Sequence, residues 1–158
     1  MMATAADEHA QPLWAGAAVM PVAVGVDGSP SSIEAFAWAA SEAQRRGALL
    51  RVVSAWQPDR SRGSAGASDV AAVRDRRRVL GELIVETIGA NPEIDVMVEV
   101  VRGSPAPVLL EAAEESALLV LGRRGRGGFP GMRLGSVGLH CVMHASCPVA
   151  IVQDPPRA

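Results

Sequence analysis

The feature that most constrains the fold of this chain is the regular alternation of short apolar runs with longer segments of helical period. Runs of β-branched and other apolar residues begin at Val22 (VAVGV), Leu49 (LLRVVSAW), Ile94 (IDVMVEVV), Ala117 (ALLVLG) and Pro148 (PVAIV). Runs of this length and composition predict buried β-strands. The segments between them start near Ser29, Asp69, Ser104 and Gly135, and they repeat apolar residues three and four positions apart. That spacing predicts helices, so the expected order is βαβαβαβαβ.

Strands that alternate with helices imply a parallel sheet with helices on both faces and right-handed crossovers. We therefore expect a single-domain α/β fold, a Rossmann-like three-layer sandwich around a five-stranded parallel sheet of order 3-2-1-4-5. In doubly wound sheets the ligand lies beyond the carboxyl ends of the strands, where the strand order reverses. In this chain that point falls between the strands that end at Asp27 and Gly122.

The 158 residues, 49% of them hydrophobic and 20% charged, suit one domain with its own core. We expect that domain over residues 21–153, with a loosely ordered N-terminal arm at 1–20 and a C-terminal tail at 154–158. The apolar stretch near the start has no preceding basic residues, and Pro12 and Pro21 interrupt it, so it does not resemble a signal peptide. No window approaches a membrane span, and the two cysteines lack a disulfide framework, so a cytoplasmic protein is expected.

Charge and composition exclude several classes of function. All 15 basic residues are arginine, which removes the lysine-containing phosphate loop and every lysine Schiff base. A net charge of −2 gives no reason to expect a nucleic-acid partner. The arginines at 74 and 76–78 have no aromatic residues among them and acidic neighbours nearby, so we expect them on a solvated helix face.

The segment from Gly122 to Gly138, GRRGRGGFPGMRLGSVG, carries the clearest chemical signal. Glycines after a strand let the backbone turn sharply and approach a ligand closely, and Gly135-Ser136 at a helix start offers N–H groups to an anion. Charge is added by Arg123, Arg124, Arg126 and Arg133. The segment predicts a phosphate site, and the alternative is a flexible surface loop with a glycine helix cap.

The spacing Gly122-x2-Gly125-x9-Gly135-Ser136 resembles the G-2x-G-9x-G-[ST] signature of ATP-binding universal stress proteins. The opening VAVGVDGS, which ends at Ser29, and the closing SCPVAIV, which begins at Ser146, resemble the same family. The resemblance implies the adenine nucleotide α-hydrolase-like fold. It also implies Asp27 at the ribose, Ala55 and Leu121 near the adenine, Gly122, Arg124 and Gly125 in the phosphate loop, and Gly135, Ser136 and Val137 at the β and γ phosphates.

The function that the resemblance implies is binding of ATP, ADP or AMP, with or without Mg²⁺, by a sensor or regulator of the stress response. It further implies a homodimer that forms through the edge strand 148–152. Because the segment supplies no evident general base and no lysine, we expect no catalytic residues and at most slow ATP hydrolysis. Gly138 and Ala55 depart from the family, which more often has a hydroxyl residue and a valine at these positions.

Two alternatives remain open at this point. One is a nucleotide-independent dimeric interaction module of the same fold. The other is an ATP-using enzyme of the pyrophosphatase type, which is disfavoured because it would need S-G-G-x-D-S where this chain has VDGSPS from Val26, and the two do not match.

A zinc site is conceivable at His140 and His144, four positions apart on the last predicted helix and close to Cys141 and Cys147. The pair lacks the glutamate of the H-E-x-x-H pattern, so we expect a polar helix face and no metal site. The serines of the chain also lack the G-x-S-x-G turn that a hydrolase nucleophile needs.

Overall fold

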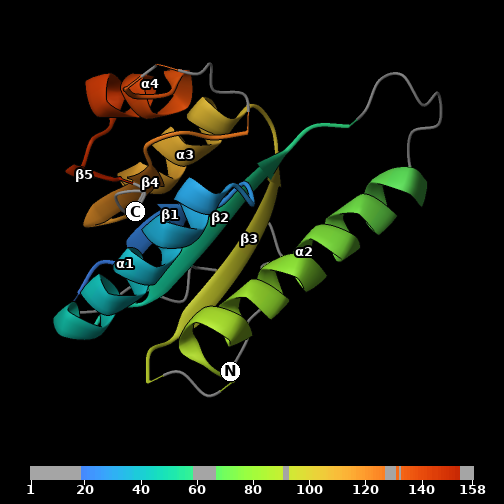
Figure 1. The fold of residues 1–158 in the computed structure, drawn as a ribbon, viewed down its shortest axis with the longest axis horizontal. Coiled ribbons are helices and arrows are strands. Elements are labelled where there is room, and N and C mark those ends of the chain that lie inside the picture. Colours follow the sequence, from blue (N-terminus) through green and yellow to red (C-terminus); the bar gives the residue numbers. More distant parts are fainter. Residues whose placement is uncertain (1–18, 59–66, 91–92, 127–130, 132, 154–158) are drawn as a thin grey trace.

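The computed structural model describes residues 19–58, 67–90, 93–126, 131 and 133–153. Its elements follow the predicted alternation (Figure 1): β1 (Val22–Gly25), α1 (Pro30–Arg46), β2 (Leu50–Trp56), α2 (Ala67–Ile88), β3 (Val96–Arg102), α3 (Pro105–Glu114), β4 (Leu118–Gly122), α4 (Ser136–His144) and β5 (Val149–Val152). Helix α2 begins two residues before its predicted start. Apart from Val19 and Met20, the predicted arm at 1–20 and tail at 154–158 lie outside the described residues, as do residues 59–66 and 127–130 of two predicted loops.

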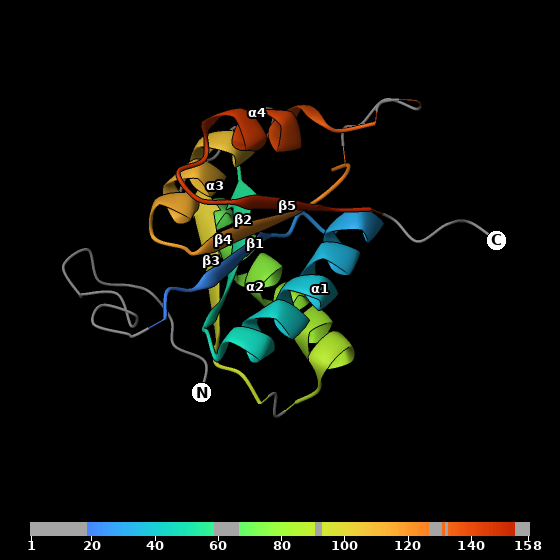
Figure 2. The same cartoon turned by 90° about the vertical axis from the view of Figure 1, so that its left-hand side faces the viewer.

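The five strands form one parallel sheet of order β3-β2-β1-β4-β5, which confirms the predicted fold class and strand order. Helices α1 and α2 cover one face and α3 and α4 cover the other, so the molecule has three layers (Figure 2). The order reverses between β1 and β4, so the chain leaves β1 toward the α1 face and leaves β4 toward the α4 face. A crevice forms between these two connections.

The central strand shows how burial on both faces produces a continuous apolar run. Val22 and Val24 pack toward α1, Ala23 packs toward α3, and all three side chains are fully buried. Strand β4 is buried in the same way through Leu118–Leu121. Strands covered on both faces lose the polar alternation of a half-exposed sheet, as observed here.

Helix α1 begins and ends with the signals that its sequence contains. The Oγ of Ser29 accepts a hydrogen bond from the Ser32 N–H at 3.2 Å, and Pro30 occupies the first helical position. Gly47, at φ +61°, ends the helix in the left-handed conformation. The start of α1 fixes the turn Asp27-Gly28 directly beyond β1.

Strand β3 lies at the sheet edge, and the alternation of Asp95 and Glu99 in its sequence predicts one solvent-exposed side. The structure shows that this prediction is wrong for Glu99. The Glu99 side chain is only 12% exposed, and its Oε2 accepts a hydrogen bond at 3.0 Å from Nη2 of Arg51, which is 9% exposed. Arg51 Nη1 also donates to the Ala112 carbonyl of α3 at 3.3 Å. The ion pair between Arg51 and Glu99 therefore lies between the sheet and helix α3.

In the part of the chain that the structure describes, no helix is long and apolar enough to cross a membrane.

Candidate functional site

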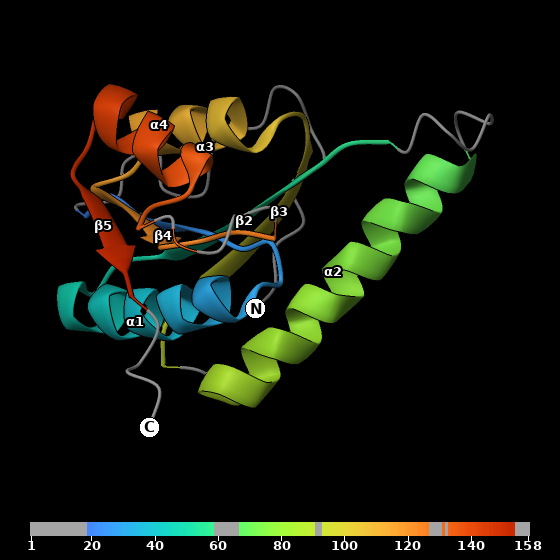
Figure 3. The same ribbon diagram turned by 45° about the horizontal axis from the view of Figure 1, so that its top comes forward.

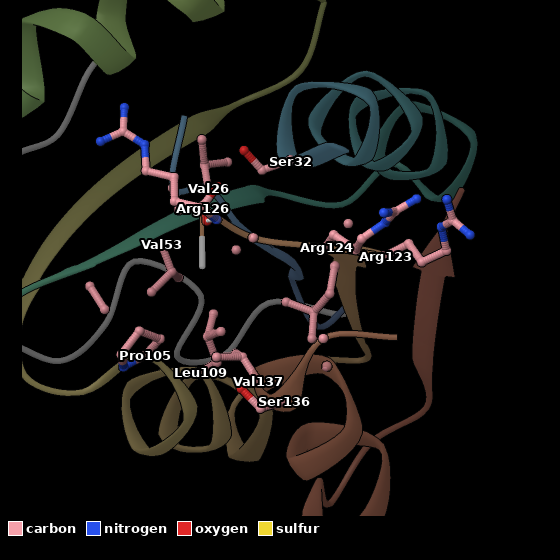
Figure 4. A pocket seen from close by; sticks show the side chains of 18 of the residues that line it. Val26, Ser32, Val53, Pro105, Leu109, Arg123, Arg124, Arg126, Ser136 and Val137 are labelled. Carbon is pink, nitrogen blue, oxygen red and sulfur yellow. Dashed lines mark hydrogen bonds between the residues drawn. The ribbon is translucent and has the colours of Figure 1, made fainter. Parts of the chain in front are cut away.

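A cavity of about 630 Å³ opens at the carboxyl ends of β1, β2 and β4 (Figure 4). This volume lies in the range of small-molecule sites. Every residue singled out in the sequence for nucleotide contact lines the cavity: Asp27, Ala55, Leu121, Gly122, Arg124, Gly125, Gly135, Ser136 and Val137. The fold thus brings together in one place residues separated by more than a hundred positions.

Asp27 lies where β1 leaves the sheet. Its Oδ1 accepts a hydrogen bond from the Ser29 N–H at 2.9 Å, and its Oδ2 accepts one from the Arg126 N–H at 3.0 Å. Burial raises the pKa of this carboxyl, but the hydrogen bonds from Ser29, Arg126 and Ser32 outweigh it and hold the pKa below its ordinary value. Asp27 is therefore an ionised carboxylate at neutral pH.

The first part of the glycine-rich segment is tied to the start of α1. A Cβ on Gly122 would lie 2.5 Å from the backbone oxygen of Ser31, so only glycine allows β4 to pass this close. Beyond it, the Arg124 N–H donates to Ser31 Oγ and Ser29 Oγ donates to the Arg124 carbonyl, each at 3.3 Å. The loop backbone is thus positioned by hydroxyl groups of the neighbouring helix.

Position 125 requires glycine because of a close contact with Asp27 that cannot be seen in the sequence. A Cβ at this position would lie 2.7 Å from Asp27 Oδ2. The sequence predicts this glycine as room for a phosphate, whereas in the structure it first leaves room for the carboxylate of Asp27.

Helix α4 points its amino end into the cavity. Gly135 is its N-cap residue, with extended backbone and no side chain to cap the helix. The N–H groups of Ser136, Val137 and Gly138 have no acceptor within the helix, as in the first turn of any α-helix. A Cβ on Gly135 would meet only ordinary contacts, the nearest being the Arg123 carbonyl at 3.7 Å. The space beside these N–H groups is therefore suited to an anion.

The arginines of the loop do not gather their side chains at one point of the cavity. In Figure 4 the side chains of Arg123 and Arg124 extend away from Val53 and Leu109. The guanidinium of Arg126 lies over Gly28, where its Nη2 would be 3.1 Å from a Cβ. Arg133 is exposed and is not among the lining residues, so the charge cluster expected from the sequence does not include it.

The remaining wall of the cavity is apolar, formed by Val53, Pro105, Leu109 and Leu121 together with Ala55 and Val137. One part of the cavity can therefore take a flat apolar group and the other part an anion. Such a combination of apolar walls with a few directed polar groups is typical of a small-molecule site.

The prediction that the α2 arginines form only a solvated face is wrong for Arg76. Its Nη1 donates to Ser54 Oγ at 3.2 Å and to the Ala55 carbonyl at 3.1 Å, and its side chain lines the cavity. A signal was available, because Arg76 stands four residues before Leu80 and eight before Ile84, on the buried stripe of the helix.

The histidines and cysteines do not gather into a larger cluster in the described ranges. The rings of His140 and His144 lie 4.5 Å apart, and both residues are exposed. Cys141 is fully buried, and burial raises the pKa of both Cys141 and Cys147. Among the residues that the structure describes, no group of three or more His, Cys, Asp and Glu could hold a metal ion.

Comparison with known proteins agrees with this geometry. The model of the universal stress protein family matches residues 19–153. A universal stress protein of Mycolicibacterium smegmatis is 37% identical over 134 residues, which cover 85% of this chain and 46% of that protein. Universal stress protein Rv1996 of Mycobacterium tuberculosis is 38% identical over 140 residues, covering 85% and 44%. The chain thus spans about half the length of these curated relatives.

A universal stress protein solved in complex with cAMP is 30% identical to this chain. It superimposes with a TM-score of 0.66, over 84% of this chain and 96% of that one. The family match, the curated relatives and the shared fold agree, and the chain belongs to the universal stress protein family.

Proposed function

We propose that the chain binds an adenine nucleotide, namely ATP or the related ADP or AMP, in the cavity beyond β1 and β4. The observation that carries the proposal is the meeting of three groups in one cavity: an ionised carboxylate, an uncapped helix start and an apolar wall. A nucleotide needs partners for its ribose, its phosphates and its base, and these groups match them in kind.

Each part of the nucleotide has an assigned set of contacts in this proposal. Asp27 accepts hydrogen bonds from the ribose hydroxyls, and the base lies against Ala55 and Leu121. The phosphates extend along Gly122, Arg124 and Gly125 and end at Gly135, Ser136 and Val137. The Gly135 N–H already donates to the Arg123 carbonyl at 2.9 Å, so the N–H groups of Ser136 and Val137 are the donors at that end. The protein of known structure that is 30% identical is described as a complex with cAMP, which supports an adenine nucleotide.

Mg²⁺ fits the site only as a partner of the phosphates. Among the described lining residues Asp27 is the single carboxylate, with hydroxyl oxygens on Ser32 and Ser136. Magnesium that is bound through one carboxylate keeps most of its other positions for phosphate oxygens and water. The ion would therefore arrive with ATP and neutralise phosphate charge.

The same residues argue for regulation and against fast chemistry. The described lining holds no histidine and no glutamate, and both oxygens of Asp27 already accept backbone N–H groups. Activation of an attacking water needs a positioned base, so we propose at most slow hydrolysis. The bound nucleotide would then be a signal, and the protein a cytoplasmic sensor or regulator of the stress response.

The regulator would act as a homodimer joined at residues 148–152. Strand β5 is an edge of the sheet, and an unpaired edge can pair with a second copy. Helix α4 packs beside β5 (Figure 2). It exposes Leu139, Val142 and Met143, whose spacing of three and four positions places them on one face of the helix. This apolar face would extend the contact beyond the strand.

A nucleotide-independent interaction module is the second candidate, and one observation favours it. The N–H groups of Arg124 and Arg126 already donate to Ser31 and Asp27 within the chain, so the glycine-rich turn is organised without a ligand.

Two measurements separate the candidates. Mass spectrometry of small molecules released by denaturing the purified protein should find an adenine nucleotide, and calorimetry with ATP, ADP, AMP and cAMP should rank them. Absence of released nucleotide together with absence of binding by all four would support the interaction module.

A further inference from the structure

The carboxyl end of β2 extends beyond its neighbour β1 at the cavity. The Val26 N–H donates to the Val53 carbonyl at 2.9 Å, after which β1 turns away at Asp27 and Gly28. Alternate residues of a strand bond to the same neighbour, so the peptide groups of Ala55 face the side where β1 is missing. Strand β3 is on the other side, where the Trp56 carbonyl accepts from the Gly103 N–H at 2.9 Å. On the cavity side of Ala55, therefore, no described strand pairs with its N–H and carbonyl.

Arg76 of α2 already donates a hydrogen bond to the Ala55 carbonyl. Its Nη1 lies 3.1 Å from the Ala55 carbonyl oxygen and 3.2 Å from the Oγ of Ser54, a residue that is 1% exposed. Hydrogen bonds from a charged donor are stronger than those between neutral groups. Arg76 also lines the cavity, so it lies on the side from which a ligand would approach the same carbonyl and competes with that ligand.

The contact between Arg76 and Ala55 matters for α2 because the two halves of this helix are held by different kinds of contact. Its buried apolar residues, Leu80 and Ile84, lie in its C-terminal half, whereas Val70 in the N-terminal half is 71% exposed. Polar contacts hold the N-terminal half: Arg76 on the end of β2, and Asp69, whose carboxylate lies 3.7 Å from Arg102 of β3. Figure 3 shows α2 as a separate rod beside the sheet, beyond β3.

Adenine has an exocyclic amine, which is a hydrogen-bond donor, next to a ring nitrogen, which is an acceptor. These two groups match the carbonyl and the N–H of Ala55. We propose that the base and Arg76 compete for the Ala55 carbonyl, so that binding displaces the guanidinium and loosens the N-terminal half of α2. This inference rests on the proposed binding of an adenine nucleotide. It makes α2 the element that reports occupancy of the site.

The binding test compares Arg76→Met, which keeps an unbranched apolar stem and removes the guanidinium donors, with Arg78→Met. Arg78 is on the same helix and loses the same charge, but it is 59% exposed and pairs with Asp75 and Glu82. Adenosine is the main probe because it lacks phosphate charge. Calorimetry should show adenosine binding about tenfold tighter to Arg76→Met than to wild type, since the competing hydrogen bond is gone. Arg78→Met should bind like wild type, and ATP should gain less because its phosphates lose an attractive charge.

Hydrogen exchange of the backbone amides in residues 69–79 provides a test that needs no variant. In wild type these amides should exchange faster with ATP bound than without it, and in Arg76→Met they should be fast already without nucleotide. Equal or weaker adenosine binding by Arg76→Met, or unchanged or slower exchange on ATP binding, overturns the competition. A wild-type protein that binds neither ATP nor adenosine would instead refute the proposed function itself, so the two failures are distinguishable.

Discussion

The Arg126 N–H donates a hydrogen bond of 3.0 Å to Asp27 Oδ2, joining the glycine-rich loop to the end of β1 across 99 positions of the sequence. The other carboxylate oxygen accepts the Ser29 N–H, so Asp27 connects β1, α1 and the loop. The carboxylate that we assign to the ribose is therefore also a structural joint. Experiments on Asp27 have to separate these two roles.

Asp27→Ala should weaken ATP binding by about 1 to 3 kcal/mol, the range for a hydrogen bond to a charged group. Inorganic triphosphate should lose less, because it has no ribose, and the difference between the two ligands measures the ribose contact. Calorimetry gives both values, with the exposed Asp75→Ala as the control. Equal losses of binding free energy for ATP and triphosphate would mean that Asp27 does not contact the ribose and acts only by organising the loop.

The lowered pKa of Asp27 predicts how it affects folding stability at different pH. Its folded pKa lies below the ordinary value of 3.8, so the ionised carboxylate stabilises the fold above that pH. The contribution is lost as pH falls through the folded pKa. Urea unfolding should therefore show wild type more stable than Asp27→Asn at pH 7, with a difference that shrinks below about pH 4. A difference that is constant across this range contradicts the assignment.

Gly135→Ser should abolish nucleotide binding and preserve the fold. The structure has room for a Cβ at this position, and a serine Oγ can cap the helix by accepting the N–H groups that we assign to phosphate. Stability should stay equal or rise by a few tenths of a kcal/mol, about the difference between serine and glycine caps. Gly125→Val should also abolish binding, but it would displace Asp27 as well, so it is the less specific variant.

Gly81→Ala is the matched control for Gly135→Ser. It lies within α2, nothing stands within 4 Å of its added Cβ, and it does not line the cavity. It should raise the free energy of unfolding by about 0.5 to 1 kcal/mol and leave nucleotide affinity unchanged. If Gly135→Ser binds ATP as tightly as Gly81→Ala, the start of α4 does not hold the phosphates.

The fold and the position of the cavity could be predicted because both depend on local patterns. The apolar runs near Val22, Leu49 and Ala117 determine strands, the segments between them determine helices, and the connection rules then leave few topologies. The position of Asp27 and Gly122 at the switch point follows from that topology alone.

Contacts between distant polar residues could not be predicted in this way. The sequence predicts Glu99 on the exposed side of its strand and Arg76 on a charged helix face, and it contains no signal that Arg51 is the partner of Glu99. Their burial depends on which helix covers them, because a charge leaves water only when a partner lies close to it. The reason for Gly125 was missed likewise, since it depends on the carboxylate of Asp27.

Glu99→Gln tests the ion pair beneath α3. Loss of the negative charge leaves Arg51 largely buried with a weaker partner, so the free energy of unfolding should fall by about 3 kcal/mol. Glu82→Gln on α2 is the control, because Glu82 is 58% exposed in its pair with Arg78 and should contribute less than about 1 kcal/mol. Urea unfolding decides between them, and equal losses would mean that the Arg51 pair contributes no more than a surface pair.

The last prediction concerns the proposed homodimer. The Pro148 carbonyl accepts a hydrogen bond from Leu119 of β4, and the Val152 carbonyl accepts one from Arg123, directly after β4. Alternate residues of a strand face the same neighbour, so Ile151 directs its N–H away from β4. Ile151→Pro should remove a donor that a partner strand would need, and edge strands tolerate proline where no ladder bond is lost within the protomer.

A second variant tests the same contact without changing the backbone. Met143 is 67% exposed on α4 beside β5, so Met143→Glu places a charge on the apolar face that would meet its copy, whereas Val70→Glu, at a position 71% exposed on α2, is the control. Sedimentation at micromolar concentration should show a wild-type dimer that both Ile151→Pro and Met143→Glu convert to monomer and Val70→Glu does not. Because Ile151 also packs against the α3 and α4 side of the core, circular dichroism must show that the monomer of that variant is folded. A monomeric wild type, or dimers of unchanged strength in both variants, would rule out pairing through β5.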